Sequence, residues 1–547
     1  MRQAILLSLI PTLVLAQEDF TRRDRTALLY QTKFVFTPDH CPVVNILVME
    51  GVPSARFGTD GPIELLPEGE GGPSLRLGSG RVECSATLEG GRPGRIRWWV
   101  ALARVTGADL DAVRQEQAAL EARGFKVRLF ERGSVFGFFG KVLDNRVWVL
   151  VEDLPHETLE KARARRDVVA PEVKAADVFE EMVERPFGII RVACPGVNAS
   201  FPGLVAIAPP PGKTIHVRDV EFGKGFAWHG HEDRSYRGQI YLTADRNGRL
   251  AIVNVVDAET LLKGLVPSEV WPDAPMEALK AQAVAARSEL FAKLGQRHTA
   301  DPYMVCGDVH CQVYRGTARE DERTSRAVDE TRGEMLFAGD RLVDAVYCAS
   351  CGGHTESAAA VWPGEARQPL SGVLDGPEGV LDPLAQGPSE DAVLTFLRSP
   401  PRGVYCGSSR FGRDSFRWQR FVSLTDIRRG VLEQTGRDVG SVKGLRTLER
   451  GVSGRVMRLE VQGTDGNVEL TSELSIRKAL GGLKSSLFAI VGRTSEGGVD
   501  GIQLLGGGFG HGAGMCQTGA VGMAEHGRRY REILGHYYVG AAVVRIY

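Results

Sequence analysis

Residues 506–520 read GGGFGHGAGMCQTGA, and residues 265–287 read LVPSEVWPDAPMEALKAQAVAAR. The first stretch holds seven glycines in fifteen positions, although glycine destabilises both helices and strands. Such a segment is typical of tight turns, where the backbone needs positive φ angles or approaches another group closely. The second stretch places Glu269 between two prolines at the start of a predicted helix. Together the two stretches predict a site built from one carboxylic acid and a glycine-rich turn that carries a histidine.

The composition is ordinary for a multidomain globular protein. The chain of 547 residues is too long for one hydrophobic core, and its length predicts about three or four domains. Hydrophobic residues make up 43% and charged residues 25%, as in typical globular proteins. The net charge of −1 lacks the basic excess of proteins that bind nucleic acid or anionic membranes. We therefore expect neither of these partners.

The N-terminus predicts a secretory signal. Arg2 precedes an apolar run that ends at Ala16, and acidic residues follow at Glu18 and Asp19. This order predicts a signal peptide over residues 1–16 and export to the periplasm or cell envelope. An uncleaved anchor is the alternative, but the run is short for a bilayer span. No other window approaches a transmembrane length, so we expect no membrane span in the mature chain.

Three regions follow the signal. Residues 17–90 predict a small β segment and a linker, because an alternating apolar pattern gives way to Gly-, Pro- and Ser-rich sequence. Residues 91–180 follow a β-α-β-β-α order, which is typical of a small ferredoxin-like unit. Residues 187–547 begin with several strands and then contain a long helix, from Pro275 to Gly295, with one apolar face. The predicted class is α+β, with a strand-rich main domain.

Five blocks in the last region occur in the order found in one family. They read VPSEVWP at 266–272, CQVYRG at 311–316, VYCASCGGHTESAAAVWPG at 346–364, GGGFGHGAGMCQTGAVGMA at 506–524 and ILGHYYVGA at 533–541. On these blocks, residues 187–547 resemble the SpoIID (stage II sporulation protein D) family. An alternative extent of the resemblance includes the short segment near residues 43–64, with the unit at 91–180 inserted between the two parts. A second, weaker resemblance concerns the inserted unit, which is similar to the SPOR domain. It is carried by WWVALARV at 98–105, ALEARGFKV at 119–127 and RVWVLVEDLPHETLEKARAR at 146–165.

The first resemblance implies a lytic transglycosylase of peptidoglycan. Such enzymes cut the β-1,4 bond after N-acetylmuramic acid without water and leave a 1,6-anhydro sugar, and SpoIID prefers glycan strands denuded of stem peptides. Relatives called LytB are regarded as amidase enhancers, which implies a non-catalytic alternative with a cell-wall amidase as partner. The SPOR-like unit implies a second contact with glycan strands. A generic interaction domain is the alternative for that unit, because its topology serves many functions.

The resemblance places Glu269 at the catalytic position of the family. Glycosidic cleavage needs a proton on the leaving oxygen, and the usual hydrolase adds a second carboxylate. A lytic transglycosylase manages with one, because the sugar's own C6 hydroxyl attacks and the same carboxyl group serves as acid and then as base. The acid must stay protonated near neutral pH, and apolar neighbours raise its pKa. The alternative is a glutamate that stabilises a helix start.

The other blocks supply candidate substrate contacts. His511 and Gln517 lie in or next to the glycine-rich turn, whose N–H groups are predicted to cradle a sugar oxygen or a carboxylate. A structural turn with a hydrogen-bonded histidine is the alternative. Dinucleotide binding is not supported because no second βαβ half follows. A serine hydrolase built on Ser350 is also not supported, because the segment lacks the G-x-S-x-G elbow. The remaining predicted contacts are Ser350, Tyr347, Gly352, Gly508 and Gly510.

Nine cysteines are an odd number for an exported chain, in which most cysteines pair. His298, Cys306, His310 and Cys311 offer two imidazoles and two thiols, a set that suits tetrahedral zinc. Disulfides Cys306–Cys311 and Cys348–Cys351 are the alternative. A zinc ion with four protein ligands would be structural, so we expect no cofactor in the chemistry itself. A zinc hydrolase, the third class considered, would instead yield reducing ends and lose activity with a chelator.

Overall fold

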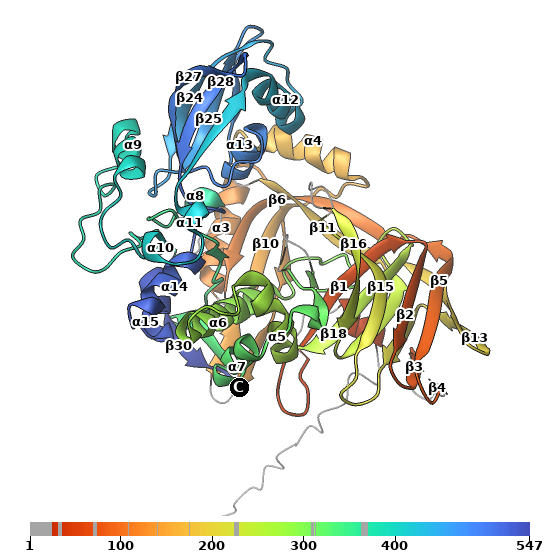
Figure 1. Ribbon diagram of the computed structural model, residues 1–547. Coiled ribbons are helices and arrows are strands. Elements are labelled where there is room, and N and C mark those ends of the chain that lie inside the picture. The colour runs from red at the N-terminus through yellow and green to blue at the C-terminus, as the bar shows by residue number, and fades with distance from the viewer. Residues whose placement is uncertain are drawn as a thin grey trace, which may run out of the picture.

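The structure is a computed structural model that describes residues 25–30, 35–68, 74–107, 109–138, 141–173, 176–223, 229–307, 311, 313–362 and 370–547 (Figure 1). The predicted signal peptide lies outside the described residues. The described chain mixes strands and helices, with strands predominating, so the predicted α+β class is confirmed. Among the described helices, not one combines the length and apolar character that crossing a bilayer requires.

Two antiparallel-rich sheets form the main β body and share one core. The first has the order β19-β1-β18-β17-β14-β3-β4, and the second has the order β13-β12-β5-β2-β15-β16. Both sheets contain strands from before and after the inserted region, so residues 43–92 belong to the same body as residues 187–257. Long-range pairing joins this segment to the later strands, which favours the alternative that the segment near residues 43–64 belongs to the main domain over a separate segment at 17–90. The bounds are β1 (Val43–Val52), β2 (Ser54–Thr59), β3 (Ile63–Pro67), β4 (Leu75–Leu77), β5 (Val82–Arg92), β12 (Phe187–Cys194), β13 (Val197–Pro202), β14 (Leu204–Ala208), β15 (Ile215–Phe222), β16 (Gly230–Tyr236), β17 (Gln239–Ala244), β18 (Leu250–Asp257) and β19 (Val305–Cys306).

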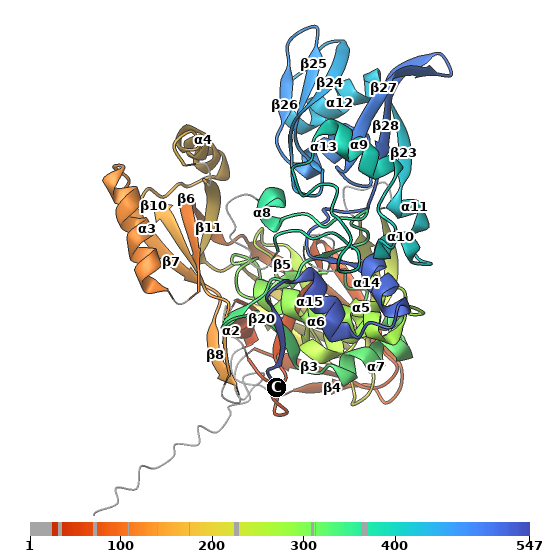
Figure 2. The ribbon, with the colours of Figure 1, turned by 90° about the vertical axis from the view of Figure 1, so that its left-hand side faces the viewer.

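A four-stranded unit is inserted between β5 and β12. Its sheet has the order β11-β6-β10-β7 with antiparallel neighbours, and two helices accompany it at one side of the molecule (Figure 2). β5 and β12 pair with each other, with Arg92 opposite Phe187, and a Cys84–Cys194 disulfide joins the same two strands. The unit thus leaves and re-enters the body at one point. Its elements are β6 (Arg95–Thr106), α3 (Leu110–Ala122), β7 (Val127–Arg132), β8 (Val135–Phe138), β9 (Lys141–Asp144), β10 (Val147–Glu152), α4 (Leu159–Val169) and β11 (Asp177–Glu184).

The inserted unit is docked on the main body. The side-chain amide of Asn145 donates to the carbonyls of Phe291 (2.7 Å) and Leu294 (2.9 Å), at the end of helix α6 (Met276–Lys293). Arg246, between β17 and β18, forms an ion pair with Glu180 of β11 (2.7 Å). These contacts fix the unit beside the helix that follows Glu269.

Helix α6 confirms the long helix predicted after Pro275, but the single buried face predicted for it is wrong. Almost every residue from Ala278 to Lys293 is buried, because α5, α7, α14, α15 and β20 all pack against it. Its many alanines allow this close packing on several sides. The surrounding elements are α5 (Ala258–Glu269), η1 (Gly316–Arg319), α7 (Glu322–Glu330), β20 (Glu334–Ala338), β21 (Arg341–Leu342), α14 (Gln517–Glu525), α15 (Tyr530–Tyr537) and β30 (Ala542–Arg545), and a short helix α2 (Arg25–Tyr30) packs near the β body.

An upper lobe is built from the chain between β22 (Tyr347–Cys348) and β29 (Met515–Cys516), which pair in parallel (Figure 1). It contains two three-stranded sheets, β23-β28-β27 and β24-β25-β26, and hydrophobic cores of its own. The two chain segments that lead into and out of this lobe therefore run side by side, and both share a core with α6. The lobe comprises α8 (Ala358–Val361), α9 (Glu390–Arg398), α10 (Tyr405–Ser408), α11 (Arg413–Phe416), β23 (Trp418–Ser423), α12 (Leu424–Thr435), β24 (Val442–Arg450), β25 (Val456–Gly463), β26 (Val468–Leu470), α13 (Glu473–Ala479), β27 (Phe488–Glu496) and β28 (Val499–Gly506).

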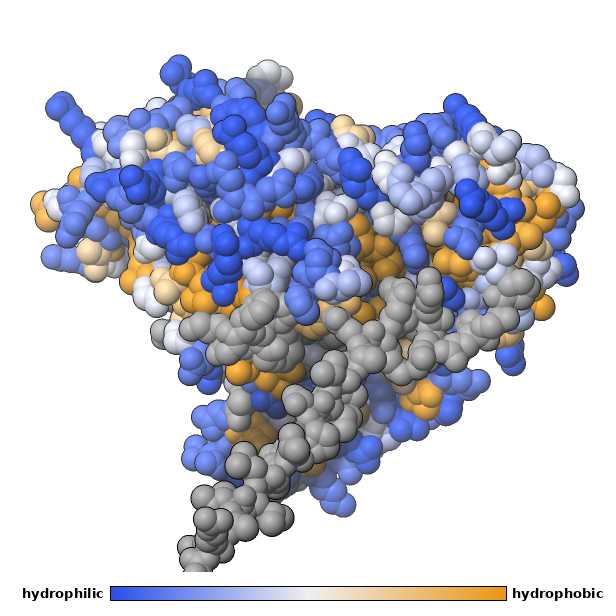
Figure 3. Space-filling model, turned by 90° about the horizontal axis from the view of Figure 1, so that it is seen from below, coloured by the Kyte–Doolittle hydropathy of each residue, from blue (hydrophilic) through white to orange (hydrophobic). Residues whose placement is uncertain are grey.

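The surface seen from below is mostly hydrophilic, and hydrophobic residues show in several separate areas between hydrophilic ones (Figure 3). This view agrees with the ordinary composition of the chain.

Candidate active site

Glu269 is the last residue of α5. The helix begins after Asp257, whose side chain accepts the N–H of Thr260 (2.9 Å). It ends just before Trp271 and Pro272, because a residue that precedes proline disfavours the helical conformation. The predicted position at a helix start is therefore wrong. A carboxylate at the C-terminal end faces the negative pole of the helix dipole, so Glu269 does not stabilise a helix start.

The surroundings of Glu269 favour its protonated form. The side chain is partly buried, and its Oε1 accepts the N–H of Val313 (3.2 Å). Burial, and then the negative charge of Glu289, raise the pKa of Glu269 to about 7, while the Val313 N–H and the charge of Lys293 act in the opposite direction. A carboxyl group with this pKa holds a proton over part of the neutral range, as a general acid must.

Helix α6 brings a second carboxylate next to Glu269. Glu289 and Lys293 lie one turn apart and form a buried ion pair. The hydroxyl of Tyr347 hydrogen-bonds to Glu289, and burial, followed by the charges of Glu269 and Glu289, raises the pKa of Tyr347 well above its usual value. Glu289 is thus bonded to two side chains. Among the described residues, the carboxyl group of Glu269 has the Val313 N–H as its hydrogen-bond partner.

Gln517 holds the backbone of Glu269. Its side-chain amide donates to the carbonyl oxygen of Glu269 (2.9 Å) and to Oε1 of Gln282 on α6 (3.3 Å). Gln517 is almost fully buried, so its amide group faces the protein interior. The contacts favour a role in orienting the acid over the predicted direct contact with substrate.

The glycine-rich turn packs tightly against the chain that follows β22. Gly508 and Gly510 have φ angles of 82° and 98°, and a Cβ atom at Gly508 would lie 2.9 Å from the carbonyl oxygen of Ser350. The N–H groups of Gly508 and Gly510 donate to the carbonyls of Phe416 (3.3 Å) and Lys484 (2.9 Å). These two N–H groups are therefore used within the protein and do not cradle a ligand. The glycines permit the turn to approach the backbone around Ser350 closely.

Ser350 and Gly352 lie on the other side of this close contact. The N–H of Ser350 donates to the carbonyl of Phe509 (3.1 Å), and a Cβ atom at Gly352 would lie only 2.7 Å from the nitrogen of Gly508. The Ser350 side chain is fully buried, and its Oγ has no hydrogen-bond partner among the described residues. Both residues therefore serve the close packing of the two segments.

His511 lies in the same turn and bonds to Tyr347. Its Nδ1 accepts the N–H of Ala513 (3.1 Å), the ring also hydrogen-bonds to the backbone of Tyr347, and it packs against Trp362 with ring centroids 4.9 Å apart. Burial and then the charge of Arg455 lower the pKa of His511 to about 3, so the ring is neutral at ordinary pH. These contacts favour the alternative of a hydrogen-bonded structural histidine, here one that positions Tyr347.

Sequence reasoning missed the partners that α6 contributes. Glu289 and Lys293 have the four-residue spacing of a helical ion pair, which was the available signal. It also missed the pair formed by Trp271 and Phe411, whose partly exposed rings stack at 4.7 Å close to Glu269 in sequence. The contact could not be anticipated because Phe411 comes from the upper lobe.

Three of the four predicted metal ligands meet near the end of α6. The ligand atoms of His298, Cys306 and Cys311 all lie within 4.8 Å of one another, with 3.4 Å between Nε2 of His298 and the Cys311 sulfur. Nδ1 of His298 lies 3.0 Å from a carboxylate oxygen of Asp301, the outer contact that metal-binding histidines commonly make. His310, the fourth predicted ligand, lies outside the described residues. The three donors therefore fit a zinc ion.

The disulfide alternatives for this part of the chain are not formed. No disulfide joins Cys306 to Cys311 or Cys348 to Cys351. A small cavity lies beside the first two, and Lys293 contributes to its wall. The His298 group and the carboxyl groups around Glu269 thus border the same part of α6.

Comparisons with known proteins now identify the family. Residues 246–337, which contain α5 and α6, match the family described as Stage II sporulation protein. This segment belongs to the SpoIID/LytB family. The predicted resemblance is thereby confirmed for this part of the chain. A further match, over residues 356–514, is to a family described as a domain of unknown function, and neither match reaches the inserted unit.

Three relatives share between 25% and 29% of the aligned residues. An uncharacterized protein of Brachyspira hyodysenteriae is 29% identical over 323 residues, which cover 58% of this chain and 74% of the relative. The amidase enhancer of Bacillus subtilis is 28% identical over 304 residues, 52% of this chain and 40% of the relative. Stage II sporulation protein D of Bacillus amyloliquefaciens is 25% identical over 319 residues, 56% and 77% of the two chains.

Proposed function

We propose that this protein is a peptidoglycan lytic transglycosylase that cleaves the β-1,4 bond between N-acetylmuramic acid and N-acetylglucosamine in denuded glycan strands. The observation that carries the proposal is the carboxyl group of Glu269, which has a pKa of about 7 within the segment that matches the SpoIID family. The protonated carboxyl group donates its proton to the leaving glycosidic oxygen as the bond to C1 breaks. The C6 hydroxyl oxygen of the muramic acid then bonds to C1, and its proton passes to the Glu269 carboxylate. The product is a 1,6-anhydro sugar, and the acid is restored.

The neighbours of Glu269 support intramolecular attack over hydrolysis. A two-carboxylate hydrolase needs its second carboxylate to attack the sugar or to activate water. Glu289 is the nearby carboxylate, but it is bonded to Lys293 and Tyr347. Gln517 holds the Glu269 backbone, and Val313 holds one carboxyl oxygen, so the proton is delivered from a fixed position.

The product distinguishes the possible functions. The purified full chain is incubated with denuded sacculi, and the ends released are identified by mass spectrometry. Anhydro ends support the transglycosylase. Reducing ends would indicate a hydrolase, and neither kind of end, together with stimulation of an added amidase, would indicate an enhancer. The similarity to the amidase enhancer of Bacillus subtilis supports this last function as the second candidate. In that case, the partner of the protein would be a cell-wall amidase.

A charge change on α6 should shift the pH dependence of the reaction. Replacing Glu289 by glutamine removes the negative charge that raises the pKa of Glu269, and it frees Lys293, whose charge lowers that pKa. Both effects favour the carboxylate. We expect the basic limb of the kcat/KM–pH profile, where the acid loses its proton, to move down by about one pH unit. Lys293→Met should move it upward. Identical limbs in both variants would mean that another group titrates.

The inserted unit is proposed to be an SPOR-like, ferredoxin-type domain that holds the protein on glycan strands. The βαββαβ order of β6, α3, β7, β10, α4 and β11, with its antiparallel sheet, supports this assignment. Because Arg92 lies opposite Phe187, a short turn can replace residues 93–186 and leave β5 and β12 paired.

We predict that this deletion weakens binding to sacculi while it preserves the chemistry. The apparent affinity in co-sedimentation should fall by about 10²-fold, since a second binding contact acts through effective concentration. Soluble glycan oligomers should still yield anhydro ends. The Cys84–Cys194 disulfide, checked by peptide mapping, reports whether the joined strands still pair. Unchanged binding to sacculi would assign the unit to a different partner.

A zinc ion held by His298, Cys306 and Cys311, with His310 as the predicted fourth ligand, is proposed as a structural element. It would tie the segment after α6 to β19, and the chemistry at Glu269 proceeds without it. Export and attachment to the cell envelope are proposed as well. The signal predicted over residues 1–16 and the Cys84–Cys194 disulfide support this location, and so does a substrate that lies outside the cytoplasmic membrane.

A further inference from the structure

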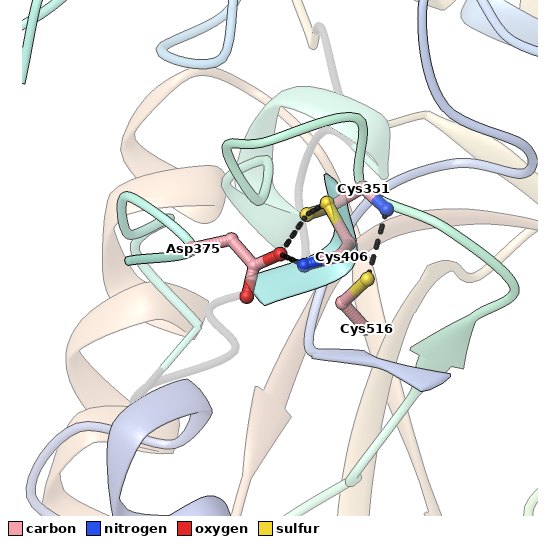
Figure 4. A group of neighbouring side chains, drawn as sticks. All are labelled: Cys351, Asp375, Cys406 and Cys516. Carbon is pink, nitrogen blue, oxygen red and sulfur yellow. Dashed lines mark hydrogen bonds between the residues drawn. The ribbon is translucent and has the colours of Figure 1, made fainter. Parts of the chain in front are cut away.

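A second group of metal-binding side chains lies where the chain enters and leaves the upper lobe. Cys351 follows β22, Asp375 and Cys406 come from the lobe, and Cys516 precedes α14. The four side chains are almost fully buried, and their ligand atoms lie within 4.8 Å of one another. Figure 4 shows the sulfur atoms of Cys351 and Cys406 side by side, with the carboxylate of Asp375 next to them and Cys516 below. Segments far apart in sequence thus meet in one small volume.

The spacing of these atoms fits one tetrahedral ion. Zinc–sulfur bonds of about 2.3 Å place two ligand sulfurs about 3.8 Å apart at the corners of a tetrahedron. The sulfurs of Cys351 and Cys406 are 3.7 Å apart, and the Cys351 sulfur lies 3.4 Å from Oδ2 of Asp375. An iron–sulfur cluster would need more room, because its inorganic core stands between the thiolates. The group therefore has the size of a mononuclear site.

Backbone N–H groups surround the sulfurs. The N–H of Cys351 donates to the Cys516 sulfur (3.1 Å), that of Gly353 to the Cys351 sulfur (3.3 Å) and that of Gly519 to the Cys516 sulfur (3.3 Å). Cys516 is also the N-cap of α14, where the helix dipole favours a negative charge. Neutral thiols are weak acceptors. Such a set of donors favours thiolates, the form in which cysteine binds a metal.

Asp375 lacks a cationic partner within the protein. Among the described residues, its side chain forms no ion pair with Lys, Arg or His. Its Oδ1 accepts the hydroxyl of Tyr537 (2.6 Å), and its Oδ2 accepts the N–H of Cys406 (2.9 Å). A carboxylate that is fully buried is costly unless it is paired or bound to a metal. The hydrogen bonds hold it as outer contacts hold a metal-ligating carboxylate.

Two arginines lie against the loop that carries Cys351. Arg455 is fully buried and donates to the carbonyl of Cys351 (2.9 Å), and Arg417 donates to the carbonyl of Gly352 (2.8 Å). Three thiolates and one carboxylate would leave a negative charge around a divalent ion, and these guanidinium groups partly balance it.

We propose that Cys351, Asp375, Cys406 and Cys516 bind one Zn²⁺ ion in a closed tetrahedral site, separate from the His298 group. Four protein ligands leave no open position, so the ion is structural. It fastens α14, whose first residue is Gln517, to the segment that begins with Tyr347. The ion would thus fix the two segments whose residues contact Glu269 and Glu289, and its loss would loosen them together.

The test counts zinc in the full chain, purified without chelator. In Cys306→Ser, which loses a ligand of the His298 group, we expect one zinc ion per chain to remain. Its X-ray absorption should show three sulfur ligands at about 2.3 Å and one oxygen ligand at about 2.0–2.2 Å. Cys306→Ser combined with Cys406→Ser should hold none. As a control, Cys41→Ser removes a buried thiol elsewhere, beside Asp257, and should leave the zinc content unchanged.

Thiol mapping keeps the proposal testable if the double variant does not fold. In the folded Cys306→Ser variant, the thiols of Cys351, Cys406 and Cys516 should resist alkylation until a chelator is added. Absence of zinc from that chain, or a disulfide between Cys351 and Cys406, would overturn the proposal. Zinc bound through fewer than three sulfurs would overturn it as well. None of these results depends on which product the protein forms, so the proposed transglycosylase activity stands or falls separately.

Discussion

Replacing Glu269 by glutamine is expected to lower the yield of 1,6-anhydro ends from denuded sacculi by about 10²-fold or more, if Glu269 is the proposed acid. Glutamine keeps the shape of the side chain and can still accept the N–H of Val313, but it cannot donate a proton to the leaving oxygen or take one from the C6 hydroxyl. The measurement is the rate at which anhydro ends appear by mass spectrometry. Binding to sacculi should stay near the wild-type level.

A matched control is available within the same family segment. Glu322 is exposed at the start of α7, and Glu322→Gln should retain full activity. If Glu269→Gln retained wild-type turnover, the proposed chemistry would be wrong, and the amidase-enhancer candidate would become the better explanation.

Glu269→Gln should also change the pH dependence of the free energy of unfolding. The carboxyl group of Glu269 titrates at about 7 in the folded chain, against a usual value of 4.5. Between these values the folded state binds more protons than the unfolded state, so its stability falls as pH rises. The interval corresponds to about 3 kcal/mol. Glu269→Gln should therefore melt above the wild type at pH 8 and together with it at pH 4. A gain at both values would point to a cause other than ionisation.

Replacing Arg287 by methionine should cost about 3–5 kcal/mol of stability. Arg287 of α6 is fully buried and makes two hydrogen bonds to Glu259 of α5, at 2.8 and 2.7 Å. It also donates to the carbonyls of Glu334 and Val328. Methionine fills much of the same volume but leaves the buried carboxylate without its cation. Chemical denaturation of the full chain measures the loss.

Two comparisons make this prediction specific. Glu259→Gln in the Arg287→Met background should recover part of the stability, because it removes the uncompensated charge. Arg326→Met breaks an exposed ion pair with Glu330 and should change stability by less than about 1 kcal/mol. A loss below that limit in Arg287→Met would show that the buried pair contributes little to holding α5 against α6.

Local sequence signals predict several elements around the proposed site but not how they assemble. Pro275 and Gly295 mark the ends of α6, and the motif around Glu269 points to the proposed acid through a family resemblance. The sequence did not predict the helix that ends at Glu269. Pro267 lies inside this helix, and a proline usually indicates a helix start or a break. The burial of α6 on several sides also depends on elements far away in sequence.

The remaining errors concern contacts between distant segments. The pairing of β5 with β12 spans the whole inserted unit, so the alternating pattern of residues 43–92 gave no sign of its partner. The roles of His511 and Gln517 depend on Tyr347 and on the carbonyl of Glu269, and neither contact follows from a local pattern. Cys351 and Cys516 are likewise 165 positions apart. Spacing along the sequence therefore cannot show which cysteines lie together in the fold.

The docking of the inserted unit has a consequence for where a polymer is cut. A module on a flexible tether searches a volume around its anchor. Here Asn145 bonds to the backbone at the end of α6, and Arg246 bridges to Glu180, so the unit has a constant offset from Glu269. If the unit binds a glycan strand, the protein sets the distance between the bound saccharide and the bond that is cleaved. The lengths of the released fragments would then reflect that distance.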